Sequence, residues 1–218
     1  MDLKNYKRVG VAIAMASESE SLLASQPFKL IEKTPFEIYN LKDLYIVSSG
    51  YGTLNAALAT QYLIEKYSCD CIVNFGVCGY TGKKNLHGGL FSVDKAYKRD
   101  VDCCLLGYEK YALPHDTAFI SLKTDIVLPQ CTLFTSDEFV GPDSKVESDV
   151  LVDMEGYAVA FACRRHGVDC YLFKSVCDST EENTDRQQYD DKLDGALMGM
   201  DEYINKMFAD YLDSSAKV

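Results

Sequence analysis

Three carboxylates stand where apolar, strand-like runs of this sequence come to an end. Glu18 follows the run "VAIAMAS", Glu155 follows "VLVDM" and Asp178 follows "LFKSVC". Carboxyl groups can donate or accept protons in a reaction, and ionised carboxylates accept hydrogen bonds from hydroxyl groups. Such residues also have structural uses, because Glu18 suits the first turn of a helix and Asp178 suits a turn cap. The residues alone leave both interpretations open.

Two glycine-containing segments follow other apolar runs, and we predict a turn in each. They read "SGYGT" at 49–53 and "NFGVCGYTG" at 74–82. Glycine lets the backbone approach a ligand closely, because no side chain is in the way. The second segment is no dinucleotide-binding fingerprint, since its glycine spacing is wrong and no strong helix follows directly. Ordinary tight turns are the alternative. Because ligand sites in α/β proteins form where strand carboxyl ends converge, we expect the acids and glycines to meet there.

The elements that position these residues alternate between strand and helix patterns. Apolar side chains at helical spacing predict helices over 54–67, 155–166 and about 188–212. Short apolar runs predict strands over 9–15, 36–39, 44–48, 71–75, 90–96, 131–135, 150–154 and 170–177. This alternation predicts an α/β fold, a three-layer sandwich in which helices flank a central twisted, mixed β-sheet. No repeat or linker interrupts the pattern, so residues 1–218 are expected to form a single domain.

Composition restricts the class of partner. The chain has 218 residues, is 47% hydrophobic and carries a net charge of −11 with no basic stripe, which argues against nucleic acid. Its apolar runs are too short to cross a membrane and its N-terminus lacks a signal-peptide core, so we expect a soluble, cytoplasmic protein. Nine cysteines lie partly in strand-like runs without zinc-ligand spacing, which favours reduced thiols and predicts neither metal nor cofactor. A small molecule is the expected partner.

The order of the motifs resembles the nucleoside phosphorylase and nucleosidase superfamily, most closely its methylthioadenosine/S-adenosylhomocysteine nucleosidase branch. The similar segments span most of the chain and read "AMASESE", "SGYGTLNAALAT", "NFGVCGY", "DKAYKRDVD", "LGYEKYALP", "TSDEFV", "VDMEGYAVA" and "KSVCDST". The resemblance implies a nucleoside phosphorylase-like fold. It also implies an enzyme that hydrolyses the N-glycosidic bond of 5′-methylthioadenosine, S-adenosylhomocysteine or a related adenosine and releases the free base.

The resemblance also implies roles for the three acids. Asp178 would protonate N7 of the departing purine, which requires a pKa above the value of about 3.9 for a free aspartate. Glu18 would hold and deprotonate the attacking water, and Glu155 would accept hydrogen bonds from the ribose hydroxyls while the sugar becomes cationic. All three carboxylates are therefore expected around one bound nucleoside.

Further contacts follow from the same resemblance. Phe139 would stack on the base, the main chain of Val140 would pair with the purine edge, and Met154 would lie against the sugar. The remaining expected contacts lie around the water, the acid and the 5′ substituent and are Gly79, Val77, Cys177, Lys174 and Tyr51. Leu106, Tyr108 and Pro114 would come from a neighbouring subunit, which implies a homodimer with shared active sites.

Two other functions stay open beside hydrolysis. Phosphorylases of the superfamily carry arginines where this chain has "ASESE" and Asn74, so a phosphate dianion would meet Glu18 without a cationic clamp. Lys174 with a glycine turn could still hold phosphate, which keeps a purine nucleoside phosphorylase as the alternative. A catalytically weak nucleoside-binding homologue is the third possibility.

The chain departs from the family pattern in two ways that bear on substrate choice and fold. Tyr51 replaces a small apolar residue beside the 5′ substituent, which favours adenosine or another purine nucleoside over S-adenosylhomocysteine. The connection over 114–131 is shorter than usual, and we expect it to lack a helix.

Overall fold

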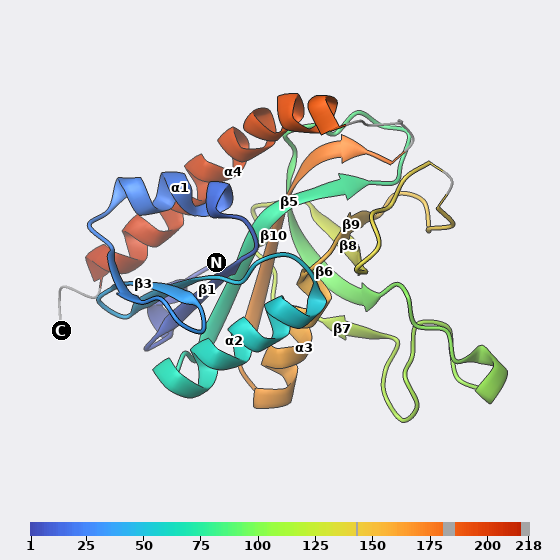
Figure 1. Cartoon of the computed structure of the whole chain (residues 1–218), viewed down its shortest axis with the longest axis horizontal. Helices are drawn as coiled ribbons and strands as arrows, with labels where there is room; N and C mark the ends of the chain where they lie inside the picture. The colour runs from blue at the N-terminus through green and yellow to red at the C-terminus, as the bar shows by residue number, and fades with distance from the viewer. Residues whose placement is uncertain (143, 181–185, 215–218) are drawn as a thin grey trace.

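A single mixed sheet with four α-helices forms the part of the protein that the structure describes, residues 1–142, 144–180 and 186–214 of a computed structural model (Figure 1). The predicted α/β class, with helices flanking a mixed β-sheet, is confirmed. The helices are α1 (Ala16–Ser25), α2 (Thr53–Tyr67), α3 (Gly156–His166) and α4 (Arg186–Ser214). The strands are β1 (Val9–Ile13), β2 (Lys29–Glu32), β3 (Glu37–Leu41), β4 (Leu44–Ser48), β5 (Cys71–Tyr80), β6 (Leu90–Lys98), β7 (Phe119–Ser121), β8 (Gln130–Thr135), β9 (Leu151–Asp153) and β10 (Asp169–Ser179).

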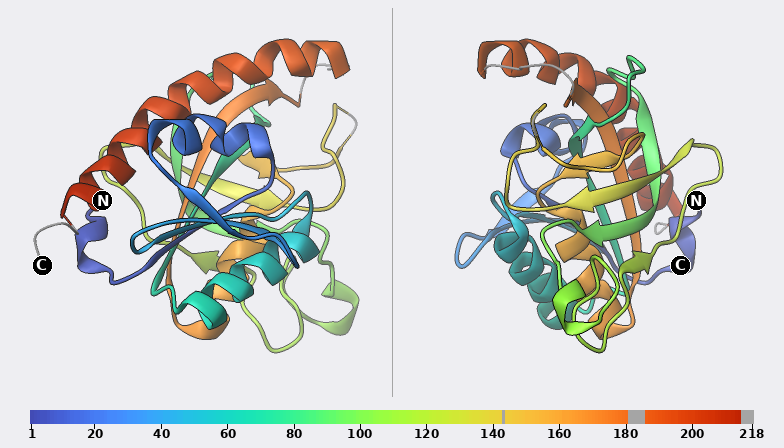
Figure 2. Two further views of the ribbon diagram at one scale, coloured as in Figure 1. Left: turned by 60° about the vertical axis from the view of Figure 1, so that its left-hand side comes forward. Right: turned by 90° about the vertical axis from the view of Figure 1, so that its right-hand side faces the viewer.

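The sheet closes on itself at one end. Its strand order is β10-β6-β8-β9-β5-β1-β4-β3-β2, with β7 paired to β6, and β10 also pairs with β5. Strands β5, β9, β8, β6 and β10 therefore form a closed ring, while β1, β4, β3 and β2 extend from it as an open wing (Figure 2). Since β1 runs parallel to both β4 and β5, and β5 runs parallel to β10, the carboxyl ends of these four strands share one edge.

Two helix pairs cover opposite faces of this sheet. Helices α1 and α4 lie together on one face, and α2 and α3 lie together on the other (Figure 1). Helix α4 buries Met200, Ile204 and Phe208 against the sheet because these apolar residues recur every four positions. Helix α3 ends at Gly167, whose φ of +66° is the left-handed conformation that glycine adopts readily. No helix among the described residues is long and apolar enough to cross a membrane.

Several elements differ from the sequence prediction. Helix α1, β2 and β7 are absent from the helices and strands that the sequence predicted. The prediction of a turn at 74–82 was wrong, because β5 continues through Gly76 and Gly79 to Tyr80. The connection over 114–131 lacks a helix, as predicted, and contributes only the three-residue strand β7 before β8 begins.

Candidate active site

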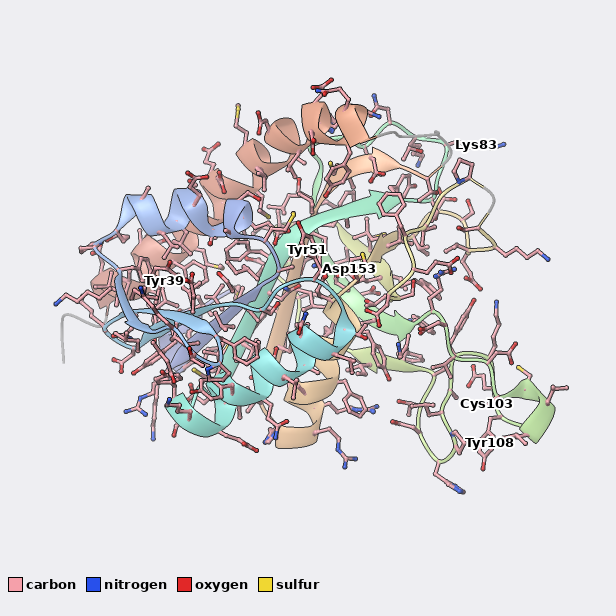
Figure 3. The ribbon with its side chains drawn as sticks, in the orientation of Figure 1. Tyr39, Tyr51, Lys83, Cys103, Tyr108 and Asp153 are labelled. Carbon is pink, nitrogen blue, oxygen red and sulfur yellow. The ribbon has the colours of Figure 1, made fainter. Side chains whose placement is uncertain are left out.

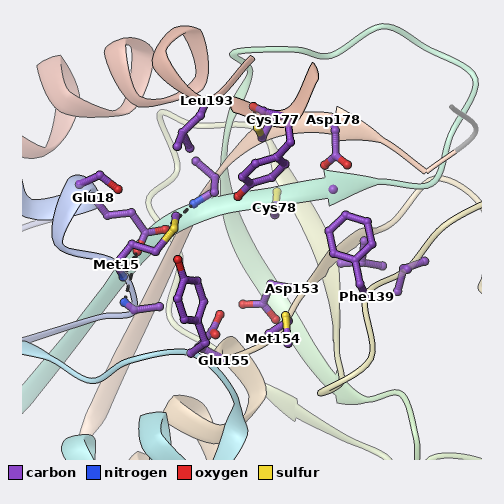
Figure 4. A pocket seen from close by; sticks show the side chains of 18 of the residues that line it. Met15, Glu18, Cys78, Phe139, Asp153, Met154, Glu155, Cys177, Asp178 and Leu193 are labelled. Atoms are coloured by element: carbon purple, nitrogen blue, oxygen red, sulfur yellow. Dashed lines mark hydrogen bonds between the residues drawn. The ribbon is translucent and has the colours of Figure 1, made fainter. Parts of the chain in front are cut away.

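A cavity of about 680 Å³ opens at the shared edge of strand carboxyl ends (Figure 4). Its walls come from the segments after β1, β4 and β9, from the ends of β5 and β10, from residues 138–140 and from the start of α4. Most of the predicted site residues line it, namely Glu18, Tyr51, Val77, Gly79, Phe139, Val140, Met154, Glu155, Cys177 and Asp178. Segments far apart in the sequence thus meet in one pocket.

Glu18 lies in the first turn of α1 and is almost completely buried. Its carboxylate accepts hydrogen bonds from the backbone N–H groups of Ala14 at 3.2 Å, Met15 at 2.9 Å and Val77 at 3.0 Å. Burial raises the pKa of Glu18, against the opposing effects of the Lys174 ammonium and these three donors. The helix-capping role and the predicted catalytic role of Glu18 are therefore compatible, because the carboxylate that caps α1 also lines the cavity.

The backbone at Gly76 passes directly beside this carboxylate. A β-carbon added at Gly76 would lie 2.5 Å from Oε1 of Glu18, which no real contact allows. The glycine of the "NFGVCGY" motif therefore does not form a turn. It makes room in strand β5 for the buried acid that arrives from α1.

Glu155 is fixed from the opposite side of the cavity. The residue stands between β9 and α3, and its Oε1 accepts a hydrogen bond of 2.7 Å from the backbone N–H of Gly52. Gly52 can point its N–H there because it adopts a φ of +92°. Burial, followed by the neighbouring Asp153 carboxylate, raises the pKa of Glu155 to about 7. The carboxylate thus changes charge near neutral pH.

Asp178 lies near the end of β10, and only 7% of the residue is exposed. The pairing between β10 and β5 shifts register between Val176 and Asp178, which is a bulge. This bulge allows the adjacent residues Cys177 and Asp178 both to line the cavity, whereas neighbours in a regular strand point to opposite faces. Gly79 of the paired strand leaves room for the acid, since a β-carbon there would lie 3.3 Å from its Oδ1.

Aromatic and apolar groups complete the two ends of the cavity. Phe139 lies beside Asp178 at one end, while Met15 and Glu18 lie at the other and Met154 with Glu155 lies between them (Figure 4). Phe139 is 60% exposed in the single chain, and the neighbouring Val140 is buried. The cavity therefore has an acid and an exposed ring at one end, a second acid at the other, and a third along its length.

Four predicted residues do not line this cavity in the single chain, namely Lys174, Leu106, Tyr108 and Pro114. Lys174 is buried, and its ammonium lies 2.9 Å from Asp153 and not at the cavity wall. The strand buries this side chain because Asp153 offers a compensating charge. Tyr108 lies on the segment that projects from the sheet, well away from Asp153 (Figure 3). Pro114 belongs to the same segment, and neither residue lines the cavity of its own chain.

Some cavity residues were missed by the sequence analysis. The start of α4 contributes Tyr189, Asp190 and Leu193, and the others are Ala14, Met15, Ser17, Cys78, Glu138, Val152 and Asp153. Helical spacing did place Leu193 on the apolar side of the last helix, but nothing in "RQQYDD" distinguishes a cavity residue from a solvated one. Ser17, Cys78 and Glu138 adjoin predicted residues in the sequence, and that proximity was the available signal.

Comparison with known proteins agrees with this architecture. The chain belongs to the phosphorylase superfamily, whose family model matches residues 8–208. It is 30% identical over 206 residues to the 5′-methylthioadenosine/S-adenosylhomocysteine nucleosidase of Exiguobacterium sp., covering 80% of this chain and 86% of that relative. The predicted family is therefore confirmed.

Solved structures show the same fold. The Neisseria meningitidis 5′-methylthioadenosine/S-adenosylhomocysteine nucleosidase in complex with methylthio-immucillin-A superposes with a TM-score of 0.81 at 24% identity, over 93% of this chain and 98% of that one. The Colwellia psychrerythraea nucleosidase in complex with adenine gives a TM-score of 0.82 at 24% identity, over 95% of each chain.

Proposed function

We propose that this protein is a purine nucleosidase that hydrolyses the N-glycosidic bond of 5′-methylthioadenosine, S-adenosylhomocysteine or a related adenosine. The observation that carries the proposal is the convergence of Glu18, Glu155 and Asp178 on one cavity, although they are far apart in the sequence. Its relatives in the superfamily carry the name of this activity. The products are the free purine and the corresponding sugar.

The base occupies the end of the cavity formed by Asp178, Phe139 and Val140. Asp178 donates a proton to N7 of the purine, so that the base leaves as a neutral molecule. Phe139 stacks on the base with its exposed ring, and the main chain of Val140 pairs with the purine edge. Cys177 and Gly79 support this end, because the bulge at Cys177 and the missing side chain at Gly79 let the acid reach the cavity.

The sugar lies over Met154 and Glu155. The Glu155 carboxylate accepts hydrogen bonds from the ribose hydroxyls, and its negative charge stabilises the positive charge that develops on the ring. Its fixed bond to Gly52 means that little reorganisation is needed when this charge appears. Tyr51, between Gly50 and Gly52, borders the 5′ substituent.

Water attacks from the end that Glu18 and Val77 form. Three backbone donors hold the Glu18 carboxylate in one orientation, which aligns it to position the water and take its proton. A positioned general base of this kind contributes roughly 10²- to 10⁴-fold to the rate. Acid and base thus act at opposite ends of the scissile bond.

Water is favoured over phosphate as the nucleophile. No Lys, Arg or His lines the cavity among the residues that the structure describes, and Lys174 is paired with Asp153. Asn74 is buried and donates a hydrogen bond of 2.8 Å to the carbonyl of Ala12, so it does not serve as an anion clamp. A phosphate dianion near Glu18 would meet uncompensated negative charge.

A homodimer completes the proposed site. Two exposed apolar side chains define the proposed contact surface, Leu106 on the projecting segment at 71% exposure and Leu54 on α2 at 78%. A second copy covering this surface would bring Leu106, Tyr108 and Pro114 toward the 5′ side of its partner's cavity. Light scattering of the purified protein tests this state, and a monomer at micromolar concentration contradicts it.

We also propose a cytoplasmic location and a role in methionine salvage. The nine cysteines are all free thiols, and six of them are buried, which suits a reducing compartment. Fractionation of cells that express the native protein tests the location, and recovery in a secreted or membrane fraction contradicts it.

The activity is tested with three nucleosides. Methylthioadenosine, adenosine and inosine are incubated with the protein, each with and without inorganic phosphate, and free base is measured. Base release that does not depend on phosphate is expected. Release that requires phosphate, with sugar phosphate as product, indicates a phosphorylase, and binding without turnover indicates a nucleoside-binding homologue. Asp178→Asn should abolish release and leave nucleoside affinity largely unchanged.

A further inference from the structure

We infer that Asp153 and Lys174 act as a pair of positioning residues that sets the ionisation of Glu18 and Glu155. Neither residue needs to touch the substrate for this role. The inference rests on the proposed function for its effect on turnover, while the ionisation itself is a property of the ligand-free protein. It assigns opposite effects to the two members of one ion pair.

The pair is buried and held rigidly. Nζ of Lys174 lies 2.9 Å from Oδ2 of Asp153, and the two side chains are only 2% and 1% exposed. The Asp153 carboxylate also accepts a hydrogen bond of 2.5 Å from the Thr135 hydroxyl and one of 2.8 Å from the backbone N–H of Gly156. Strands β8, β9 and β10 and the first turn of α3 therefore fix the ammonium in place.

The Lys174 ammonium interacts electrostatically with Glu18 and Glu155 as well as with Asp153, which it contacts. Lys174 of β10 pairs with Gly76 of β5, and Gly76 lies directly against the Glu18 carboxylate. Asp153 and Glu155 line the same cavity. Burial raises the pKa of both Glu18 and Glu155, Lys174 opposes that rise in both, and Asp153 adds to it in Glu155. Burial disfavours the charge on Lys174, but Asp153, Glu155 and Glu18 outweigh that effect and raise its pKa. Lys174 therefore stays protonated and is shared among three acids.

The other groups that face this cluster do not compensate its charge. Cys78 of β5 and Tyr189 of α4 both have pKa values raised mainly by burial, so they remain neutral near pH 7. Asp178 at the end of β10 adds a further acid near Cys78. Among the described residues that line the cavity, none carries a positive side chain. The cluster depends on Lys174 for its positive charge.

Removing Lys174 and removing the Asp153 charge should therefore have opposite effects on the pKa values of Glu18 and Glu155. Without Lys174 the carboxylates lose their cation, so the ionised forms become less favourable and the pKa values of Glu18 and Glu155 rise. Without the Asp153 charge, Glu155 loses a like charge and Lys174 is released toward both glutamates, so their pKa values fall. A charge in direct contact typically shifts a pKa by roughly one to three units.

The test compares Lys174→Met and Asp153→Asn with the wild-type protein. For each, kcat/KM for methylthioadenosine is measured from pH 5 to 9, and the glutamate carboxyl carbons of the ligand-free protein are titrated by ¹³C NMR. We expect the acid limb and the titrating glutamate signals to move up by about one pH unit in Lys174→Met. In Asp153→Asn both should move down by about one unit.

Controls separate charge from packing and from the proposed activity. Lys174→Arg keeps the positive charge, so the acid limb of its kcat/KM profile should match that of the wild type. In the Lys174→Met/Asp153→Asn double variant, this limb should lie at a pH between those of the two single variants. If Lys174→Met does not fold, the direction of the shift in Asp153→Asn decides alone. Because the NMR titration needs no substrate, it tests the inference even if the protein proves not to be a nucleosidase. Unmoved titrations, or shifts of both variants in the same direction, overturn it.

Discussion

Replacing Gly76 by alanine should displace the Glu18 carboxylate, although residue 18 itself is unchanged. Glycine at this position leaves the space that the buried carboxylate occupies beside strand β5. An added β-carbon would lie 2.5 Å from Oε1 and 3.1 Å from Cδ of Glu18, where ordinary contact begins at 3.4 Å. The carboxylate must therefore retreat by about 0.9 Å, because the strand cannot move without breaking its pairing with β1 and β10.

The expected loss of activity follows from the hydrogen bond that breaks when the Glu18 carboxylate is displaced. Oε1 accepts the 3.0 Å bond from the N–H of Val77, the residue directly after the new methyl group, and this bond is lost first. A hydrogen bond to a charged group is worth about 1.5–3 kcal/mol, and a misplacement of about 1 Å at a reacting group can cost roughly 10²-fold in rate. We expect kcat/KM for methylthioadenosine to fall by about 10²-fold.

A double-mutant cycle shows whether the loss passes through Glu18. Purine release is assayed in wild type, Gly76→Ala, Glu18→Gln and the double variant, with thermal unfolding followed in each. If the methyl group acts by displacing the carboxylate, the double variant should be no slower than Glu18→Gln alone. Multiplying losses, or a Gly76→Ala protein with wild-type kcat/KM, would refute the reasoning.

Two further predictions concern ligand binding. The pKa of Glu155 is about 7, and in the proposed mechanism its ionised form accepts hydrogen bonds from the ribose hydroxyls, so nucleoside affinity should fall about tenfold from pH 8 to pH 6. Calorimetry checks this, and an equal fall for a 2′,3′-dideoxy analogue, which lacks those hydroxyls, would contradict it. Tyr51 borders the cavity with 64% of its surface exposed, so Tyr51→Ala should raise kcat/KM for S-adenosylhomocysteine relative to adenosine by roughly tenfold. An unchanged ratio between the two substrates would show that the ring does not border the 5′ group.

The layout of the site was predictable because it depends on periodicity. Apolar runs that end in Glu155 and Asp178 and alternate with helical patterns place both acids at strand ends, and the structure agrees. Helix α1 was not predictable in the same way. Its sequence "ASESESLLAS" buries little apolar surface, and the helix is stabilised at its start by the Glu18 carboxylate, a contact that spacing alone does not reveal.

The position of Lys174 shows what periodicity cannot supply. Residues 174, 176 and 178 would share one face of a regular strand, which would bring Lys174 and Asp178 to the same pocket. The bulge before Asp178 breaks that alternation. The ammonium then pairs with Asp153 of β9, a residue 21 positions earlier in the chain. The partner of Lys174 is determined by packing and charge compensation between strands, so the sequence of β10 alone does not predict it.

The parallel pairing of β5 with β10 has a mechanical consequence. The two strands are joined from Cys71 and Asp169 to Tyr80 and Ser179. Strand β5 carries the N–H that donates to Glu18, and β10 carries Asp178 near its end. The Glu18 carboxylate of α1 is hydrogen-bonded to this strand pair and Asp178 belongs to it, so the distance between the two acids is fixed when the polypeptide folds. The motion that admits a nucleoside or releases adenine is therefore expected in the surrounding loops. Backbone amide hydrogen exchange should be slowest along the paired strands β5 and β10.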